Sequence, residues 1–329
     1  MEFKENCFIM EKEFRTKDGE AMLHVFIINS FSGNEKKTIG IREKLEHIKN
    51  MEYLVFNSEY PGHEGVLAKQ ICDLFPEEKI RFYACGGSGT FRNILKMIPA
   101  DRVIELAELP CGLSNDFLNL YGSEREKFED LENLIYGQTE DLDYLKTTVG
   151  AGHNTVSVGF DGNIVKGALI LKKLPFFRGM LPYFLVSIVA VLHADIPELQ
   201  IIADGEVFEG RFYEVAVGNG NRLGGIFHFG KKAHAKNGKM QLIMVPTKGF
   251  WYKIRMMYAA MLNHQELLER KAICRMVKSL EIRSLDGREI TVNVDGELEK
   301  AKKVRIDICE NGMHFVEPKN LDRSKLLWK

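Results

Sequence analysis

The chain carries the stretch IRFYACGGSGTFRNIL at residues 80–95, where an apolar run leads through a glycine-rich turn into a helical pattern. Ile80 to Cys85 predict a strand, and the pattern from Phe91 onward predicts a helix. The turn between them, Gly86-Gly87-Ser88-Gly89-Thr90, would present bare backbone N–H groups and the positive end of a helix dipole to an anion. Glycine lets the backbone approach such a ligand closely, and a serine or threonine hydroxyl can add a hydrogen bond. The stretch therefore predicts a phosphate-binding loop in preference to a plain strand-to-helix turn.

The residues around this loop alternate between apolar β-rich runs and helical segments through about the first 140 positions. That alternation is typical of βαβ units around a parallel sheet. The expected strands are Leu23–Ile28, Tyr53–Phe56, Ile80–Cys85 and Arg102–Leu106, and the expected helices are Lys36–Ile48, His63–Leu74 and Phe91–Ile98. We therefore expect an N-terminal α/β domain over residues 1–141.

The pattern changes after about Asp141, where short strands are separated by Asp-Gly and Asn-Gly pairs. These pairs favour the tight turns of β-hairpins. They occur at Asp204-Gly205, Asp286-Gly287, Asp295-Gly296 and Asn311-Gly312, and helices are expected near Ile164–Leu174, Met180–His193 and Phe250–Asn263. We expect a mainly antiparallel β-sandwich as the second domain, over residues 142–304, with the tail 305–329 returning to the first domain.

Composition limits the class of protein and its location. Lysine plus arginine (45) nearly equals aspartate plus glutamate (46) among the 329 residues, so no strong electrostatic field would attract nucleic acid.

The six cysteines have no C-x-x-C spacing, which predicts reduced thiols and an intracellular protein. Residues 1–20 lack the long apolar run of a secretory signal, and Leu174–Leu192 is too interrupted to supply the ~20 apolar residues of a membrane span. We therefore expect a cytoplasmic protein without a transmembrane segment.

A second loop has the same design as the first. Pro110-Cys111-Gly112-Leu113-Ser114-Asn115-Asp116-Phe117 follows the strand expected near Val103 and precedes a short helix. Ser114 could contact a phosphate, or it could simply cap that helix. Ligands of open α/β sheets bind at the carboxyl ends of neighbouring strands, so we expect the two loops to line one crevice.

These loops resemble the motifs of bacterial diacylglycerol kinases and related lipid kinases, whose catalytic domain is similar to that of NAD kinase. The resemblance covers nearly the whole chain and keeps the order and spacing of the motifs. Asn29-Ser30-Phe31-Ser32-Gly33 resembles N-P-x-S-G, Gly86 to Thr90 resembles G-G-D-G-T, and Pro110 to Phe117 resembles P-x-G-T-x-N-D-F. Further resemblances are Gly159-Phe160-Asp161, Gly218-Asn219-Gly220, Gly224-Gly225 and Asp295-Gly296-Glu297. The resemblance implies an NAD kinase-like α/β domain followed by a β-sandwich.

The resemblance also implies an activity, which is transfer of the ATP γ-phosphate to a hydroxyl of diacylglycerol or a similar lipid with the help of Mg²⁺. Such an enzyme of phospholipid metabolism would work in a cleft between the two domains, peripherally at the inner face of the membrane. The nucleotide contacts that it implies are Asn29, Ser32, Gly33, Gly86, Gly87, Ser88, Gly89, Thr90, Gly112, Ser114, Asn115 and Asp295. Residues 1–141 would then bind the nucleotide, and residues 142–304 would bind the lipid acceptor.

Two differences from the family pattern concern the metal. Ser88 stands where the family has an aspartate that helps to organise the nucleotide's metal, and a neutral hydroxyl is a weaker ligand for a hard cation. Asn237-Gly238 replaces an Asp-Gly pair of the family's structural Mg²⁺ site. Asp116 and Asp161 are the remaining carboxylates at family-like positions and are the metal candidates, with a solvated surface carboxylate an equal alternative for Asp161.

Asp295-Gly296-Glu297 resembles the segment that supplies the family's catalytic base. Glu297 is therefore the candidate to take the proton from the accepting hydroxyl. The same tripeptide occurs at Asp204-Gly205-Glu206, where it can be an ordinary hairpin turn. The position after Val292-Asn293-Val294, near the end of the second domain, favours Glu297 over Glu206.

Other functions stay open at this point. Ser88 also fits a pseudokinase that binds nucleotide or lipid, and kinases of sugars, sphingoid bases or NAD share the broad architecture. Several aromatic and aliphatic residues could form a lipid pocket, a membrane-facing edge or ordinary core, namely Phe176, Phe177, Leu181, Phe184 and Phe250-Trp251-Tyr252. The sequence does not decide the oligomeric state, and a homodimer is one option.

Overall fold

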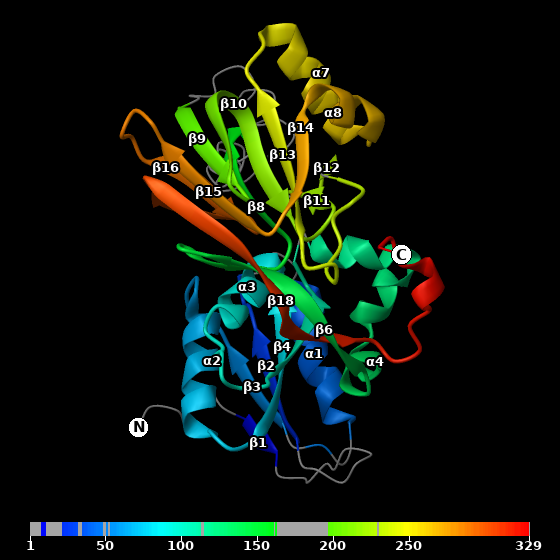
Figure 1. Ribbon diagram of the computed structural model, residues 1–329. Coiled ribbons are helices and arrows are strands. Elements are labelled where there is room, and N and C mark those ends of the chain that lie inside the picture. The colour runs from blue at the N-terminus through cyan, green and yellow to red at the C-terminus, as the bar shows by residue number, and fades with distance from the viewer. Residues whose placement is uncertain are drawn as a thin grey trace. The chain divides into compact units, whose positions relative to one another are not determined.

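A computed structural model of the chain describes residues 8–10, 22–31, 35–48, 51, 53–112, 115–160, 162, 197–228 and 230–328. The chain divides into two compact units. The first comprises residues 1–142, 312–327 and 329, and the second comprises residues 143–311 and 328 (Figure 1). The described residues include all of Gly86–Thr90, the loop 110–117 except residues 113 and 114, and both Asp-Gly-Glu turns.

The first unit is built on a parallel sheet in the order β3-β2-β4-β5, with β1 (Phe8–Met10) antiparallel to β3 at its edge. The strands are β2 (Met22–Ile28), β3 (Tyr53–Asn57), β4 (Lys79–Gly86) and β5 (Glu105–Pro110), and the helices are α1 (Glu35–Glu46), α2 (His63–Leu74) and α3 (Ser88–Leu95). All seven residues of β2 are buried, as expected of a parallel strand that is covered on both faces. The parallel α/β architecture expected from the sequence is confirmed.

One expected strand begins later than its apolar pattern indicated. Arg102 was expected to start a strand, but β5 begins at Glu105. The Arg102 guanidinium instead donates hydrogen bonds to the carbonyls of Cys72, Phe75 and Glu78, where α2 ends and the chain turns toward β4. These three bonds hold Arg102 in the turn before the strand.

The end of the chain contributes to the first unit through β18 (Lys303–Glu317). His314 and Phe315 pair in parallel with Glu105 and Leu106 of β5. The buried Phe315 ring lies within 6.0 Å of the ring centroids of Phe91, Phe117, Tyr121 and Phe128. Most of these aromatic residues come from the 3₁₀ helix η1 (Phe117–Glu129), which α4 (Leu131–Ile135) follows, while η2 (Arg323–Lys325) lies near the end of the chain.

The second unit is an antiparallel β-sandwich whose two sheets share the long strand β10 (Glu206–Gly218). In one sheet, β10 pairs with β9 (Glu198–Ala203), which pairs with β15 (Ser279–Ser284), and β15 pairs with β18. In the other sheet, β10 lies between β8 (Thr155–Gly159) and β13 (Met240–Pro246), with β16 (Ile290–Val294), β17 (Glu297–Ala301) and β14 (Ile273–Val277) further out. The register of β10 on β13 shifts between Phe212 and Glu214, and such irregularities let one strand turn from one sheet into another.

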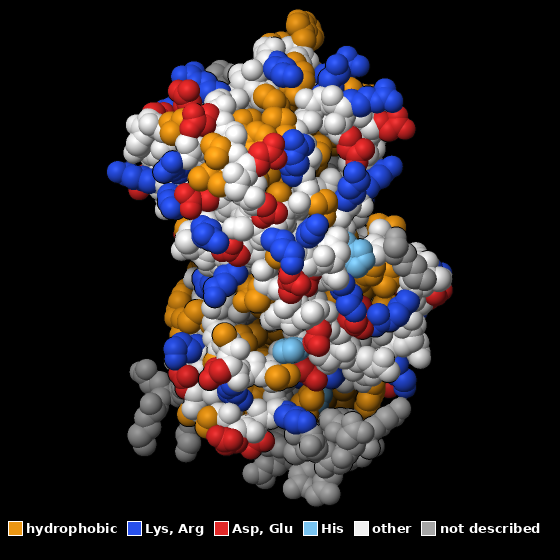
Figure 2. Space-filling model, in the orientation of Figure 1, with side chains coloured by type: hydrophobic (Ala, Val, Ile, Leu, Met, Phe, Trp, Pro, Cys, Tyr) orange, Lys and Arg blue, Asp and Glu red, His pale blue; other side chains and the backbone are white. Residues whose placement is uncertain are grey.

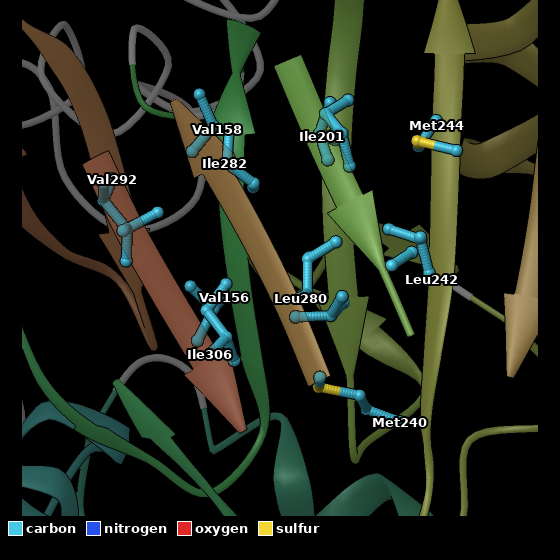
Figure 3. Packing of buried hydrophobic residues seen from close by; sticks show 14 of the residues in the cluster. Val156, Val158, Ile201, Met240, Leu242, Met244, Leu280, Ile282, Val292 and Ile306 are labelled. Carbon is cyan, nitrogen blue, oxygen red and sulfur yellow. The ribbon is translucent and has the colours of Figure 1, made fainter. Parts of the chain in front are cut away.

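The core of the second unit fills the space between these two sheets. Figure 3 shows side chains from facing strands meeting there, among them Ile201 and Ile282 from one sheet and Val158, Val292 and Leu242 from the other. The remaining strands are β6 (Gln138–Thr147), β7 (Gly150–Gly152), β11 (Arg222–Leu223) and β12 (Phe227–His228). Helices α7 (Phe250–Met261) and α8 (Gln265–Lys271) pack on residues of β10 and β13 outside this core. The antiparallel second part of the fold is confirmed, as is the helix expected near Phe250–Asn263.

Two of the four expected hairpins are correct. Asp204-Gly205 and Asp295-Gly296 have positive φ at both residues and connect paired antiparallel strands. Asp286-Gly287 does not form a hairpin, because β15 and β16 pair with other strands and the Asp286 carboxylate accepts locally from Ser284 Oγ and the Arg288 amide. The helices expected near Ile164–Leu174 and Met180–His193 lie outside the described residues.

Asn311-Gly312 also does not form a hairpin, since it lies within β18. Asn311 has a φ of 51°, and its amide donates to Oδ1 of Asp143 at 2.9 Å. The left-handed residue is therefore an irregularity within one long strand, anchored by a buried carboxylate. Within the part of the chain that the structure describes, every helix is too short or too polar to cross a bilayer.

Candidate phosphate-binding site

The glycine-rich loop joins β4 directly to the first turn of α3. Gly87 is the N-cap residue with φ −97° and ψ −176°, and its carbonyl accepts hydrogen bonds from the amides of Thr90 (3.0 Å) and Phe91 (3.3 Å). The helix thus starts at Ser88, earlier than the expected Phe91. The first amides of a helix have no partner within it, and the helix dipole is positive at that end. The strand, turn and helix start that an anion site needs are therefore present, and phosphate binding itself stays a prediction.

The second loop is clamped onto the first through one carbonyl group. The Gly86 carbonyl accepts hydrogen bonds from the amides of Cys111 and Gly112 (both 3.0 Å) and from Nδ2 of Asn115 (3.1 Å). A Cβ on Gly86 would lie 2.3 Å from Oγ1 of Thr90, and a Cβ on Gly112 would lie 2.5 Å from the Cα of Gly87. Glycine is required at both positions by these close approaches, and the expected proximity of the two loops is confirmed.

The first family-like motif reaches the same edge of the sheet through Asn29. Ile28, the last residue of β2, is in register with Cys85 of β4, so Asn29 follows its strand beside the loop. Its Nδ2 donates to Oγ1 of Thr90 at 2.8 Å, and its amide donates to the Cys85 carbonyl at 3.0 Å. Three of the expected site segments therefore converge at the carboxyl ends of β2, β4 and β5, while Ser32, Gly33 and Ser114 lie outside the described residues.

Glu108 is a residue of this site that no motif indicated. It is fully buried in β5, and its Oε1 accepts a hydrogen bond from Nδ2 of Asn115 at 2.6 Å. The same Nδ2 also reaches the Gly86 carbonyl, so the Asn115 amide connects the strand to both loops. The only sequence signal for Glu108 is an acidic residue inside an otherwise apolar run that ends at the loop.

A cavity of about 210 Å³ opens beside the second loop, within the first unit. Its walls come from α1, from the end of β5 and from the segment around α4, and include Gly40, Ile41, Lys44, Leu109, Pro110 and Cys111. The cavity borders the loop that the Gly86 carbonyl holds in place. It offers room for part of a ligand beside Pro110 and Cys111.

The donors for a metal ion are sparse in the described part of the chain. No group of three or more His, Cys, Asp or Glu side chains could hold an ion there. Asp116 is buried directly before η1, whereas Asp161 lies outside the described residues. The described residues therefore do not form a cage made only by protein. Mg²⁺ usually takes one or two carboxylates together with substrate phosphates, and a metal role for Asp116 stays a prediction.

Comparisons with known proteins bear on this geometry. Residues 24–147, which contain both loops and Asn29, match the profile of the diacylglycerol kinase catalytic domain. This part of the chain is therefore similar to the diacylglycerol kinase catalytic domain. The diacylglycerol kinase of Bacillus subtilis is 24% identical over 221 residues, which are 65% of this chain and 70% of that protein. YtlR of B. subtilis, whose name describes it as a lipid kinase, is 28% identical over 182 residues. These residues are 51% of this chain and 58% of YtlR.

The whole fold is also similar to a solved member of this family. The crystal structure of a diacylglycerol kinase from Bacillus anthracis superposes with a TM-score of 0.63 at 18% identity, covering 91% of this chain and 98% of that one. A probable YegS-like lipid kinase of Shewanella frigidimarina is 23% identical over 88% of this chain and 93% of its own length. The chain is thus a distant relative of bacterial lipid kinases along both of its units.

In the second unit, Asp295 is an anchor between distant segments. Its side chain is buried, and its carboxylate accepts hydrogen bonds from the amides of His153 (2.7 Å), Asn154 (3.2 Å) and Thr155 (2.8 Å). Burial by itself would raise the pKa of Asp295, but the His153 ring, with Nδ1 2.9 Å from Oδ2, and these amides lower it on balance. Both oxygens thus fix the start of β8, and a nucleotide contact of Asp295 stays a prediction.

The two Asp-Gly-Glu turns share this design but differ at the glutamate. Asp204 accepts hydrogen bonds from the amides of Lys278 (3.0 Å) and Ser279 (2.8 Å), much as Asp295 holds residues 153–155. Glu206 forms an ion pair with Arg275 at 3.1 Å on the surface. Glu297 is partly exposed as the first residue of β17, paired with Val294 across the turn. The structure therefore gives Glu206 a salt-bridge role and leaves the catalytic role of Glu297 as a prediction.

The position that resembles the family's structural Mg²⁺ site is organised by backbone amides. Oδ1 of Asn237 accepts from the Lys239 amide at 3.0 Å, and the Gly238 amide donates to Oδ2 of Asp143 at 2.8 Å. Asp143 is buried and also receives the Asn311 amide. Two amide donors thus reach the Asp143 carboxylate, one on each oxygen.

An apolar cavity of about 60 Å³ lies in the second unit between the outer face of its sheet and α7 and α8. Its lining is almost entirely apolar, from Phe160, Leu223, Phe227, Ile243, Met256 and Met257 among others, with Glu214 and Lys253 as the charged members. Lys253 is buried 4.8 Å from the Tyr213 ring, and burial lowers its pKa. Phe250 and Trp251 are exposed outside it, while Phe176, Phe177, Leu181 and Phe184 lie outside the described residues.

Proposed function

We propose that this protein is an ATP-dependent lipid kinase that transfers the γ-phosphate to the hydroxyl of diacylglycerol or a similar lipid. The observation that carries the proposal is the β4–Gly87–α3 loop, clamped to the Asn115 loop, within a diacylglycerol kinase catalytic domain. The first unit binds the nucleotide and the second binds the acceptor. The reaction belongs to phospholipid metabolism and takes place at the surface of a membrane.

The phosphate loop supplies positioning and charge stabilisation, on which phosphoryl transfer mainly depends. First-turn amides of α3 and the Thr90 hydroxyl, held by Asn29, face the nucleotide phosphates. Asp116 or Asp161 would supply a carboxylate to Mg²⁺, which would neutralise phosphate charge when bound. Glu297 accepts the proton of the attacking hydroxyl.

The apolar cavity of the second unit supports an amphiphilic acceptor over a sugar or a dinucleotide. Its walls offer hydrophobic contact along most of their surface, which suits an acyl chain. Glu214 and Lys253 supply two polar contacts at which the polar end of such a molecule can be oriented. A sphingoid base combines the same two features and is the nearest alternative acceptor.

A second candidate function is supported by Ser88. In the absence of the family's aspartate, and with no group of three metal-ligating side chains among the described residues, the protein could bind nucleotide or lipid as a pseudokinase. Such a protein would keep the amide cradle of the loop, because that cradle depends on glycines and a helix start. It would regulate a partner through binding alone.

Turnover of ATP separates the two functions. The purified protein is incubated with labelled ATP, Mg²⁺ and diacylglycerol, sphingosine or NAD in separate mixtures, and labelled products are resolved. Label in phosphatidic acid supports the lipid kinase, and a Gly87→Val protein should give much less at limiting ATP. ATP binding by calorimetry without any labelled product supports the pseudokinase, whereas absence of both binding and turnover overturns both functions.

A further inference from the structure

Helix α7 exposes a stripe of large apolar side chains. Trp251 is 80% exposed, Tyr258 57% and Leu262 50%, and Phe250 at the first position is 49% exposed. Positions 251, 255, 258 and 262 follow helical spacing, so Trp251, Arg255, Tyr258 and Leu262 share one face. A surface helix normally turns charged and polar residues to water. This helix instead presents aromatic rings.

The opposite face of α7 is already occupied by the protein. Met256 and Ala259 are buried against Tyr213, Ala216 and Ile243 of the sheet. The helix is therefore apolar on both faces, which is typical of helices that contact apolar surroundings all round. At 12 residues it is about 18 Å long, and a bilayer core is about 30 Å thick, so it cannot span. A helix of this kind can lie in the plane of the membrane interface.

The charges around the stripe identify the kind of surface that it fits. Residues 247–263 include Lys248, Lys253 and Arg255 but no acidic residue. Lys248 and Arg255 are exposed beside the aromatic stripe, with Lys248 Nζ 5.5 Å from the Tyr252 ring centroid. On the neighbouring α8, Glu269 is within 3.8 Å of Lys232. Figure 2 shows hydrophobic side chains protruding over α7 with Lys and Arg side chains close by.

We propose that α7 is the docking surface of this protein on an anionic lipid bilayer. Trp251 and Tyr258 lie at the level of the headgroups, where amphipathic rings are favoured, and Lys248 and Arg255 contact anionic headgroups. Docking follows from the surface of the helix and does not require turnover. Met256, Met257 and Ala260 of the same helix line the apolar cavity, so docking brings a wall of that cavity to the membrane. This last step alone rests on the proposed function.

Vesicle binding tests the proposal directly. Full-length protein is floated with vesicles of phosphatidylcholine alone or of phosphatidylcholine with phosphatidylglycerol. We expect binding to the anionic vesicles, weakened by salt, and a blue shift of Trp251 emission. The chain has one other tryptophan, the buried Trp328, so a Trp328→Phe background isolates the signal. Each surface cation contributes about fivefold in affinity, so Lys248→Glu with Arg255→Glu should weaken binding by more than about 25-fold.

Matched controls separate docking from general effects. Trp251→Ser with Tyr258→Ser should abolish binding, whereas Leu285→Ser, at a residue 44% exposed elsewhere in the second unit, should not. Arg283→Glu, at an exposed cation of β15, is the control for charge. Equal binding of the α7 variants and wild type, or equal binding to both vesicle types, overturns the proposal. A dimer that Trp251→Ser disrupts, without vesicle binding, would assign the stripe to a second copy of the chain.

The same experiments distinguish this inference from the proposed function. Turnover of a short-chain, water-soluble diacylglycerol without vesicle binding would overturn docking and leave the kinase in place. Vesicle binding without turnover would leave docking in place and overturn the kinase.

Discussion

Gly112 lies against Gly87 so closely that a Cβ on Gly112 would be 2.5 Å from the Gly87 Cα. The two glycines come from different loops, at the carboxyl ends of β5 and β4. Their contact lets the amides of Cys111 and Gly112 reach the Gly86 carbonyl. The loop Gly86–Thr90 is thus shaped by a neighbour about 25 residues later in the sequence as well as by its own glycines.

The first prediction follows from this contact. Gly112→Ala should lower the free energy of unfolding by about 1–3 kcal/mol, because the added methyl group must displace backbone, and it should weaken ATP binding. Gly40→Ala is the control, since a Cβ there meets nothing within 4 Å and alanine is favoured in helix α1. Denaturant unfolding with calorimetry measures both effects. Equal stability of Gly112→Ala and wild type would mean that the loops are not clamped.

The second prediction concerns Gly87. Its φ of −97° and ψ of −176° are extended and accessible to valine, so Gly87→Val should stay folded. The side chain would block the amides at the start of α3, and loss of one charge-assisted hydrogen bond, about 1.5–3 kcal/mol, lowers ATP affinity about tenfold to a hundredfold. Titration calorimetry checks this, with circular dichroism to confirm folding. Unchanged affinity in the folded variant would contradict the phosphate-loop assignment.

The third prediction restores a carboxylate at the site. Ser88→Asp should raise Mg²⁺-dependent ATP turnover by roughly tenfold or more, because a carboxylate is a stronger ligand for the nucleotide's metal. A carboxylate in the first turn of α3 is also favoured by the helix dipole. Ser88→Asn has nearly the same shape without the charge and is the matched control. A fall in turnover in a protein that still binds ATP would indicate a site rebuilt around a neutral residue.

The fourth prediction tests the general base. Glu297→Gln should lower kcat for lipid phosphorylation by about 10²–10⁴-fold with little change in ATP affinity, because the amide keeps the shape and loses the basic oxygen. Glu206→Gln is the control in the look-alike turn, where the side chain pairs with Arg275. Comparable rates for Glu297→Gln and wild type would leave the turn Asp295-Gly296-Glu297 with a purely structural role.

The fifth prediction concerns the pH dependence of stability. The folded-state pKa of Asp295 is lowered, because burial, which alone would raise it, is outweighed by His153 and backbone amides. The ionised Asp295 carboxylate therefore stabilises the folded state at pH values above its ordinary pKa of 3.8. This stabilisation is lost as the pH falls through the lower folded-state pKa. Asp295→Asn should cost about 3–5 kcal/mol at neutral pH, as for other broken buried pairs.

Denaturant unfolding at a series of pH values measures this effect. The difference between wild type and Asp295→Asn should shrink below pH 3.8. Asp286 is the control, because its carboxylate is exposed and its pKa is lowered mainly by the Arg288 guanidinium, so Asp286→Asn should change stability much less. A difference that stays constant down to acid pH would show that the Asp295 charge does not stabilise the fold.

The local pattern of the chain was enough to predict the strand, turn and helix start around Gly86–Thr90. The run before Gly86 and the three glycines after it predict a strand, a turn and a helix start, because each signal depends on neighbours in sequence. The same is true of the turns at Asp204-Gly205 and Asp295-Gly296, where two-residue Asp-Gly loops match the twist of the flanking strands. The order of the motifs also predicts the similarity of residues 24–147 to the diacylglycerol kinase catalytic domain.

Contacts between distant residues were decided only by the tertiary structure. His153 and Asp295 are 142 positions apart. Nothing in that spacing indicates that the Asp295 carboxylate accepts a hydrogen bond from the backbone amide of His153. Burial of Glu108, the position of Asn311 within β18 and the exposure of Trp251 also depend on what packs beside each residue. Periodicity reports which face of an element is apolar, but it does not report which surface covers that face.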